Sequence, residues 1–239
     1  MDFRLAVRLL VKSPLFTSVV VLTMAIAIGL NTTVFAAVEA LLLRPLPGAT
    51  APERIVQVYR TAPGIPWGSN SVPHYQDIRE RTTDVFEGVS AWSFAMFSLT
   101  AGNRPQQLMG EIVSANFFTT LGVRPALGRF FVPDEDIGRG AHPVAVLGNR
   151  GWRTMFGADS SIIGRTIVVN GKSLEVVGVA PPDFRGVMPV IDPVVFVPLM
   201  QMGALSPDRV DAFDRRGSNF MNVVARLKGD AALRRQQEE

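Results

Sequence analysis

The feature that most constrains this chain of 239 residues is an uncharged run of 26 residues at positions 13–38. A helix needs roughly 20 apolar residues to cross a bilayer core about 30 Å thick. Ser13 and Pro14 suit an N-cap and a first helical turn, whereas Pro45 and Gly48 stop a helix. The run therefore predicts one membrane-spanning helix. Glu39 indicates a short stalk outside the bilayer, because a carboxylate at the bilayer centre is costly.

Two other interpretations of this segment stay open. In a cleaved signal peptide, Arg4, Arg8 and Lys12 would form the basic region and residues 15–30 the apolar region. The helical pattern continues through residues 34–43, where a cleavage site should lie extended, so a retained anchor is favoured. A buried core helix is disfavoured at this length.

The basic residues before the run favour a cytoplasmic N-terminus. Arg4, Arg8 and Lys12 recur every four residues, on one face of a short interfacial helix that suits the anionic cytoplasmic leaflet. Three arginines follow the run, but long folded domains translocate largely regardless of charge. We therefore expect a single-pass membrane protein whose main domain lies on the extracytoplasmic side.

Charge and composition exclude several classes of protein. The net charge is +3 and the pI is 9.8, but residues 1–48 alone hold four basic and two acidic residues. The remainder is nearly neutral, so we expect no nucleic-acid partner, which would require a clustered basic face. The chain has no cysteine, which excludes disulfides, thiolate metal sites and a cysteine nucleophile.

Beyond Gly48, hydrophobic patterning predicts a mixed α/β domain. Asn170-Gly171 predicts a two-residue hairpin, and the polar residues 203–217 predict a surface loop. Helices are expected at residues 71–82, at 115–121 with Ser114 as cap and Gly122 as stop, at 149–156, and from Ala231 onward. Strands are expected at residues 55–59, 89–99, 107–113, 144–147, 166–169, 172–179, 194–197 and 221–227.

No residue pattern supports catalysis, and we predict no catalytic, cofactor-binding or metal-ligating residue. His74 and His142 are far apart and lack ligand-like spacing, so each is better interpreted as a surface or turn residue. Asp134-Glu135-Asp136 lacks the alternating spacing of a calcium loop, which favours an acidic turn. Trp67, Trp92 and Trp152 are expected to be core and interface aromatics rather than a ligand cage.

Residues 170–173, Asn-Gly-Lys-Ser, imitate the end of a phosphate-binding loop. That motif would require glycine at position 166, where this chain has Thr166, and a helix after Ser173. A strand pattern follows instead, so the hairpin interpretation is preferred.

The residues also resemble a known family in order along nearly the whole chain: the MacB/FtsX-type ABC transporter permeases, and within them the duplicated orphan permease (ADOP) branch. The segments that carry the resemblance are Lys-Ser-Pro-Leu-Phe-Thr at 12–17, Ile-Gly-Leu-Asn-Thr-Thr-Val-Phe at 28–35, Leu-Leu-Arg-Pro-Leu-Pro at 42–47, Ser-Ala-Asn-Phe-Phe at 114–118, Leu-Gly-Val-Arg-Pro-Ala-Leu-Gly-Arg at 121–129, Gly-Arg-Thr at 164–166, Asn170-Gly171, Val-Val-Gly-Val-Ala-Pro-Pro-Asp-Phe at 176–184 and Val-Val-Ala-Arg-Leu-Lys at 223–228.

The resemblance implies an α+β fold: one N-terminal transmembrane helix in residues 1–48, then a MacB-like periplasmic core domain in residues 49–239. That domain would hold a βαβ-type part and an inserted β-rich part, about residues 110–182. Family members carry three further transmembrane helices after this domain. The chain is therefore expected to be a fragment or truncated product whose last helix is incomplete at Glu239.

The implied function is that of a membrane-anchored permease subunit. Its periplasmic domain would couple movement driven by a separate ABC ATPase to export or periplasmic work, without chemistry or cofactors of its own. The implied partners are the lipid bilayer, that ATPase and a second copy of the chain. The alternative is a stand-alone, membrane-tethered binding or sensing module. An enzyme ranks third, because no nucleophile–base pair or metal constellation is present.

The failed phosphate loop gives a direct prediction. The purified chain should neither bind nor hydrolyse ATP, and Lys172→Ala should change its stability only mildly, because the lysine begins a hairpin strand. Equilibrium binding of a fluorescent ATP analogue checks this. Saturable binding that disappears in Lys172→Ala would contradict the hairpin assignment.

Overall fold

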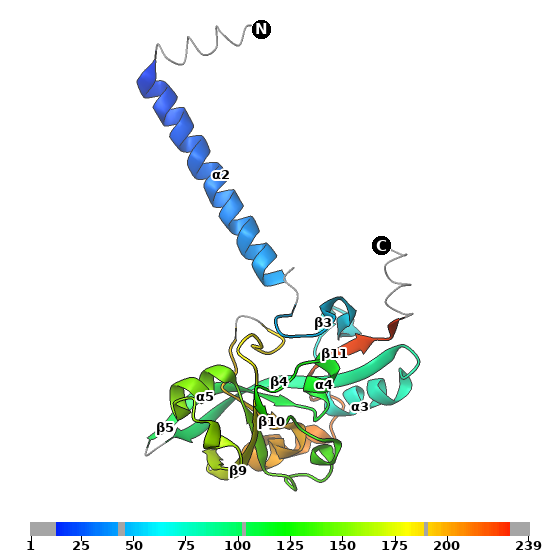
Figure 1. Cartoon of the computed structure of the whole chain (residues 1–239). Helices are drawn as coiled ribbons and strands as arrows, with labels where there is room; N and C mark the ends of the chain where they lie inside the picture. Colours follow the sequence, from blue (N-terminus) through cyan, green and yellow to red (C-terminus); the bar gives the residue numbers. More distant parts are fainter. Residues whose placement is uncertain (1–12, 43–45, 102–103, 189–190, 230–239) are drawn as a thin grey trace. The chain divides into compact units, whose positions relative to one another are not determined.

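The chain forms two compact units, Met1–Arg44 and Pro45–Glu239. The computed structural model describes residues 13–42, 46–101, 104–188 and 191–229 (Figure 1). Several sequence-based expectations fall outside these described residues: the roles of Arg4, Arg8, Lys12 and Arg44, and the helix beginning at Ala231.

The first unit contains helix α2, Pro14–Leu42. Its first residue is the one predicted, and the backbone N–H of Thr17 donates to the carbonyl of Ser13 at 3.0 Å. Within α2, Pro14–Ala36 has the length and apolarity to cross a membrane, with a mean hydropathy of 2.1. It is the one such span among the described residues, and Pro14–Ala36 contains no charged residue.

The second unit is organised around a nine-stranded sheet with the order β1-β11-β4-β5-β10-β7-β9-β6. The pairs β5–β10 and β7–β9 are parallel, and the other pairs of this sheet are antiparallel. The strands are β1 Ile55–Val58, β4 Phe86–Ala101, β5 Arg104–Val113, β6 Leu127–Gly128, β7 Val144–Leu147, β8 Thr166–Val169, β9 Lys172–Val179, β10 Val195–Pro198 and β11 Asn222–Leu227.

Strand β8 closes part of this sheet on itself, because it pairs with both β4 and β9. Pairing therefore runs round a circuit of six strands, β4-β5-β10-β7-β9-β8. Gly110 in β5 permits close approach within this circuit, since an added Cβ would lie 2.6 Å from the carbonyl oxygen of Val195 and 2.7 Å from the Phe97 ring.

Short helices and turns join the strands (Figure 1). The α-helices are α3 Val72–Arg81, α4 Phe117–Leu121, α5 Asn149–Phe156 and α6 Met202–Leu205. The 3₁₀ turns are η1 Pro52–Arg54, η2 Pro133–Asp136, η3 Ser160–Ile162, η4 Leu199–Gln201 and η5 Pro207–Phe213.

Alternation along the strands divides the buried side chains between two cores. In β4, Phe97 and Leu99 belong to the first core, whereas Trp92 belongs to the second. The first core also takes side chains from α3, α6 and η5. The second is rich in aromatic rings, among them Phe117, Phe118, Phe130, Phe184 and Phe196, and the rings of Phe118 and Phe130 stack at 3.8 Å between centroids.

Most sequence-based elements are confirmed, including β7, β8, β9 and helices α3 and α5. The hairpin prediction is confirmed in detail, because Asn170 and Gly171 both have positive φ, 48° and 75°, as a type I′ turn requires. The Asn170 side chain also accepts from Ser98 N–H at 2.7 Å and donates to the Leu205 carbonyl at 2.9 Å. The division of the domain into a βαβ-type part and an inserted part stays a prediction.

Two local predictions are wrong. Ser114 does not cap α4, which begins at Phe117 after Asn116. The Ser114 hydroxyl instead accepts the backbone N–H of Ala91 in β4 at 3.0 Å, so it is committed to the sheet. Residues 203–217 are not simply a surface loop. They include most of α6 and all of η5, which bury Leu205 and Phe213 in the first core as isolated apolar anchors.

Two arginines fasten the start of this unit to the sheet. Arg226 of β11 is buried, and its Nε and Nη2 donate to the carbonyls of Thr120 and Thr50 at 2.6 and 2.7 Å. Burial lowers the pKa of Arg226 from its ordinary value. Arg54 donates through Nε to the Leu227 carbonyl at 2.9 Å and pairs with Glu87 at 2.6 Å. The segment that opens the domain is thus bonded to β11 and to the end of α4.

One buried carboxyl stands out in the second core. Glu111 of β5 is fully buried, and neither of its oxygens has a hydrogen-bond partner among the described residues. Gly186 packs closely against this carboxyl, since an added Cβ on Gly186 would lie 2.5 Å from Oε1 of Glu111. Desolvation raises the pKa of Glu111 from 4.5 to about 8, so the carboxyl is largely neutral at pH 7.

Glu111 should make stability depend on pH. The native chain keeps this proton up to about pH 8, whereas the unfolded chain releases it near pH 4.5, so stability falls as pH rises through that window. We expect Glu111→Gln, a neutral mimic, to remove this loss in urea unfolding of the detergent-solubilised chain. Glu175→Gln, at an exposed position of β9, is the control and should keep the wild-type slope. An unchanged slope in Glu111→Gln would contradict the assignment.

Candidate functional site

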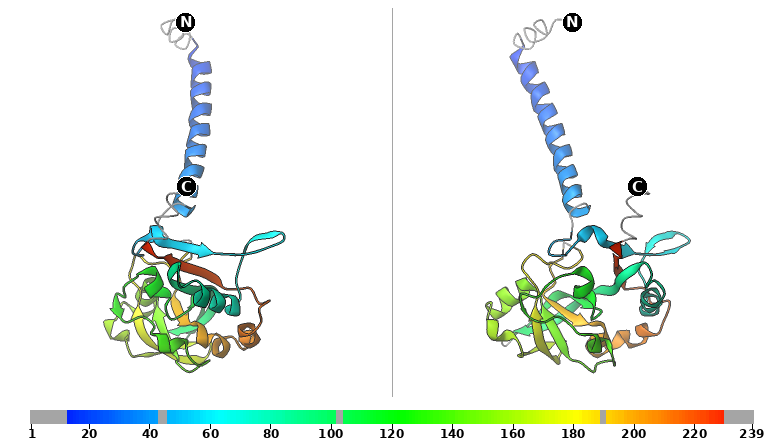
Figure 2. Two further views of the ribbon diagram at one scale, coloured as in Figure 1. Left: turned by 90° about the vertical axis from the view of Figure 1, so that its right-hand side faces the viewer. Right: turned by 45° about the vertical axis from the view of Figure 1, so that its right-hand side comes forward.

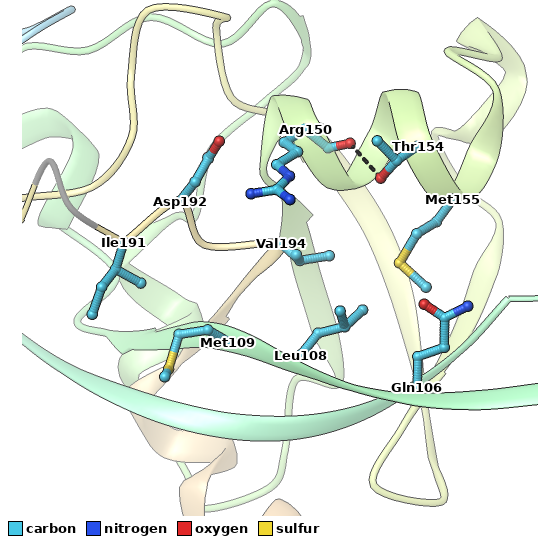
Figure 3. A pocket seen from close by; sticks show the side chains of 9 residues that line it. All are labelled: Gln106, Leu108, Met109, Arg150, Thr154, Met155, Ile191, Asp192 and Val194. Atoms are coloured by element: carbon cyan, nitrogen blue, oxygen red, sulfur yellow. Dashed lines mark hydrogen bonds between the residues drawn. The ribbon is translucent and has the colours of Figure 1, made fainter.

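A cavity of about 510 Å³ opens between β5, α5 and the segment that leads into β10 (Figure 3). Small-molecule sites usually occupy about 300–1,000 Å³ and are mainly apolar with a few polar groups. The lining residues fit that description: Gln106, Leu108, Met109, Arg150, Thr154, Met155, Ile191, Asp192 and Val194.

The elements that carry this lining explain its chemistry. Leu108 and Val194 form part of the cavity floor beside the first core, and Met155 adds a flexible side chain from α5. Arg150 comes from α5 and Asp192 from the segment before β10, and both line the cavity (Figure 3). Among the described residues neither has an ion-pair partner within 4.0 Å. The arrangement suits binding of a small amphipathic group.

Helix α5 lies close to the strand end because it contains Gly151. An added Cβ there would lie 2.5 Å from Cγ1 of Val194, so only glycine permits this approach. The helix ends at Gly157, which has a φ of 62°. The Trp152 indole Nε1 donates to the Asp159 carbonyl at 2.9 Å and fixes the far side of the helix. The cavity wall is therefore held by backbone packing.

The two histidines do not meet. His74 lies in the first turn of α3, where its backbone N–H donates to Ser71 Oγ at 3.3 Å. His142 lies just before β7, and its carbonyl accepts from Val144. In the part of the chain that the structure describes, no three His, Asp or Glu side chains gather as a metal site would need.

The acidic turn is confirmed as η2, and its charges serve the fold. Glu135 is buried, accepts the Val132 N–H at 2.8 Å and pairs with Arg129 at 2.8 Å. Burial raises the pKa of Asp136. The Arg79 guanidinium, whose Nη1 lies 4.0 Å from Oδ2 of Asp136, acts in the opposite direction and lowers that pKa. Because Glu135 is already occupied, the three carboxylates do not form a ready cation site.

The tryptophan prediction holds for two of three residues. Trp92 is buried in the second core, and Trp152 packs against the first. Trp67 is not a core residue, since 75% of it is exposed, and its place at an interface stays a prediction. Lys172 begins β9 opposite Val169, so it has no role in a phosphate loop.

Several residues with a role in the structure carry no signal in sequence. In the sequence, Glu111, Arg226 and Arg150 look like ordinary charged residues. Only the folded structure shows what surrounds each of them. The alternation of β5 did offer a hint for Glu111, because a lone acid between apolar neighbours falls on a buried face.

Comparisons with known proteins agree with this fold. Among solved structures, the periplasmic region of MacB from Actinobacillus actinomycetemcomitans matches with a TM-score of 0.54 at 13% identity, over 77% of this chain and 79% of that chain. The extracellular domain of the noncanonic ABC-type transporter YknZ from Gram-positive bacteria gives 0.53 at 12% identity, over 76% and 87%. A domain of a protein assigned as a permease in Porphyromonas gingivalis gives 0.52 at 15%, over 78% and 84%.

At such low identities these structures establish the fold alone. No curated protein matches the sequence closely. The family model of the MacB-like periplasmic core domain, however, matches residues 17–239, from within α2 to the last residue. The chain therefore belongs to the MacB-like periplasmic core domain family, found in MacB/FtsX-type ABC transporter permeases.

Proposed function

We propose that this chain is the membrane-anchored part of a permease whose periplasmic core domain transmits movement from a partner ATPase to export or periplasmic work. The observation that carries the proposal is the extent of the family match, which includes most of the candidate span Pro14–Ala36 as well as the domain. In this proposal α2 crosses the inner membrane once, with the N-terminus in the cytoplasm.

In this proposal a separate partner ATPase hydrolyses the nucleotide, as the family resemblance implies. Residues 170–173, the one segment that imitates a phosphate loop, form a hairpin. We accordingly infer no catalysis by this chain. The ADOP branch, the inserted part at about residues 110–182 and a homodimer belong to the same proposal, and they follow from the sequence resemblance.

A second candidate function is a membrane-tethered binding or sensing module that works without an ATPase. The cavity between β5 and α5 favours it, because Arg150 and Asp192 are polar groups free to orient a ligand over an apolar floor. The two candidates differ in one requirement: only the permease needs ATP hydrolysis by another subunit.

Topology is the first point to test. Alkaline phosphatase fused after Gly48 should be active and green fluorescent protein at the same site dark, because the first works only outside the cytoplasm and the second only inside. Alkaline extraction should leave the fusion in the membrane, since a spanning helix is not removed by pH. A control fusion after Lys12 should give the reverse pattern.

Two results would contradict the proposal. A fluorescent fusion after Gly48 would reverse the orientation. A soluble product beginning between about Ala40 and Ala51 would show that the segment is a cleaved signal peptide.

A further inference from the structure

A small β-hairpin projects from the second unit without joining its main sheet. Strands β2, Arg60–Ala62, and β3, Ile65–Gly68, pair only with each other (Figure 2, in cyan). An isolated two-stranded hairpin is marginally stable in water because it has no core of its own. This one nevertheless exposes 75% of Trp67, 48% of Ile65 and 43% of Tyr59.

The hairpin is held in place at its root. The rings of Tyr59 and Trp67 meet edge to face, 5.4 Å apart. Asn70 donates through Nδ2 to the Val58 carbonyl at 3.0 Å, and its backbone N–H donates to the Met221 carbonyl at 2.7 Å. The exposed rings are therefore presented outward by a fixed base and are ordered before any partner arrives.

The charges of the hairpin are as distinctive as its rings. Residues 59–69 contain one basic side chain, Arg60, and no acidic one. A surface with Trp, Tyr, a branched aliphatic residue and a single arginine matches the side chains that occupy a membrane–water interface. There, amphipathic rings and cationic groups lie at the level of the lipid headgroups.

We propose that this hairpin inserts the side chains of Trp67, Tyr59 and Ile65 into the headgroup region of a lipid bilayer. The proposal rests on membrane anchoring by α2, which is part of the proposed function. Tyr59 lies 13 positions after Leu46, so the hairpin root lies within about 45 Å of Leu46, near the start of its unit, even if the chain were extended.

Lipid is a better occupant than a protein partner because of the area involved. Two aromatic side chains bury about 150–250 Å² each. With one isoleucine the hairpin stays below the about 800 Å² per partner of a stable protein interface. Insertion into a bilayer needs no such minimum, since the acyl boundary surrounds each side chain separately and the span already holds the chain at a membrane.

Fluorescence quenching by brominated lipid tests the proposal. The full chain is reconstituted in phosphatidylcholine–phosphatidylglycerol vesicles with and without bromine on the acyl chains. The chain has three tryptophans, so the difference between wild type and Trp67→Phe isolates the emission of Trp67. We expect that component to be lost in brominated vesicles and kept in plain ones, and its access to aqueous acrylamide to fall.

A matched control uses Ile137, which is 65% exposed on another surface segment. Ile137→Trp in the Trp67→Phe background should keep its emission in brominated vesicles. Equal quenching at position 137 would reveal general adsorption and overturn the proposal. Protection of Trp67 from acrylamide without bromine quenching would overturn it too, in favour of a protein partner or second copy. Release of the chain by alkaline extraction would instead refute anchoring by α2, independently of Trp67.

Discussion

The buried guanidinium of Arg226 is the interaction on which the second unit depends. It joins three parts of the chain: β11 itself, the carbonyl of Thr120 in α4, and the carbonyl of Thr50. Among the described residues no carboxylate pairs with it, so carbonyl oxygens alone satisfy its buried donors. Removing such a group leaves several buried acceptors unsatisfied, which costs more than the bonds contribute net.

This link gives a physical meaning to the proposed transmission of movement. Thr50 also binds the end of α4, through its hydroxyl to Gly122 at 2.7 Å and its N–H to Leu121 at 3.2 Å. Gly122 leaves room for it, since a Cβ there would lie 2.9 Å from Thr50 and 3.1 Å from the Arg226 guanidinium. In the proposed function, a displacement of the segment that opens the domain would be passed to β11, which pairs with β1 and β4. A flexible opening segment would absorb such a displacement instead of passing it on.

Sequence predicts this fold well where one residue decides the local geometry. Asn170-Gly171 predicts the type of its turn because few other residue pairs readily adopt two positive φ angles. Sequence-based prediction fails where a side chain has two possible partners. Serine is a common N-cap residue, yet the Ser114 hydroxyl accepts a hydrogen bond from β4. Periodicity likewise overlooks one-turn elements such as α6, because the two buried residues Met202 and Leu205 are too few to make a pattern.

The candidate site was less predictable than the fold. The cavity brings together residues of β5 and α5 that are more than 40 positions apart. Neither segment carries a sequence pattern that predicts contact with the other. The same holds for Trp67, whose letter is typical of a core. Only the separation of β2 and β3 from the main sheet shows that its ring lies outside both cores, where it meets the Tyr59 ring.

Hydrogen exchange of the detergent-solubilised full chain can test whether Arg226 fastens the opening segment. In Arg226→Met, which keeps the length but loses the donors, the amides of Thr50 and Arg54 should exchange about tenfold faster or more, because bonds to a charged donor are lost. The β8–β9 hairpin amides should not change. Arg165→Met, at an exposed arginine paired with Asp159, should leave Thr50 at its wild-type rate. Unchanged protection of Thr50 and Arg54 in Arg226→Met would contradict this account.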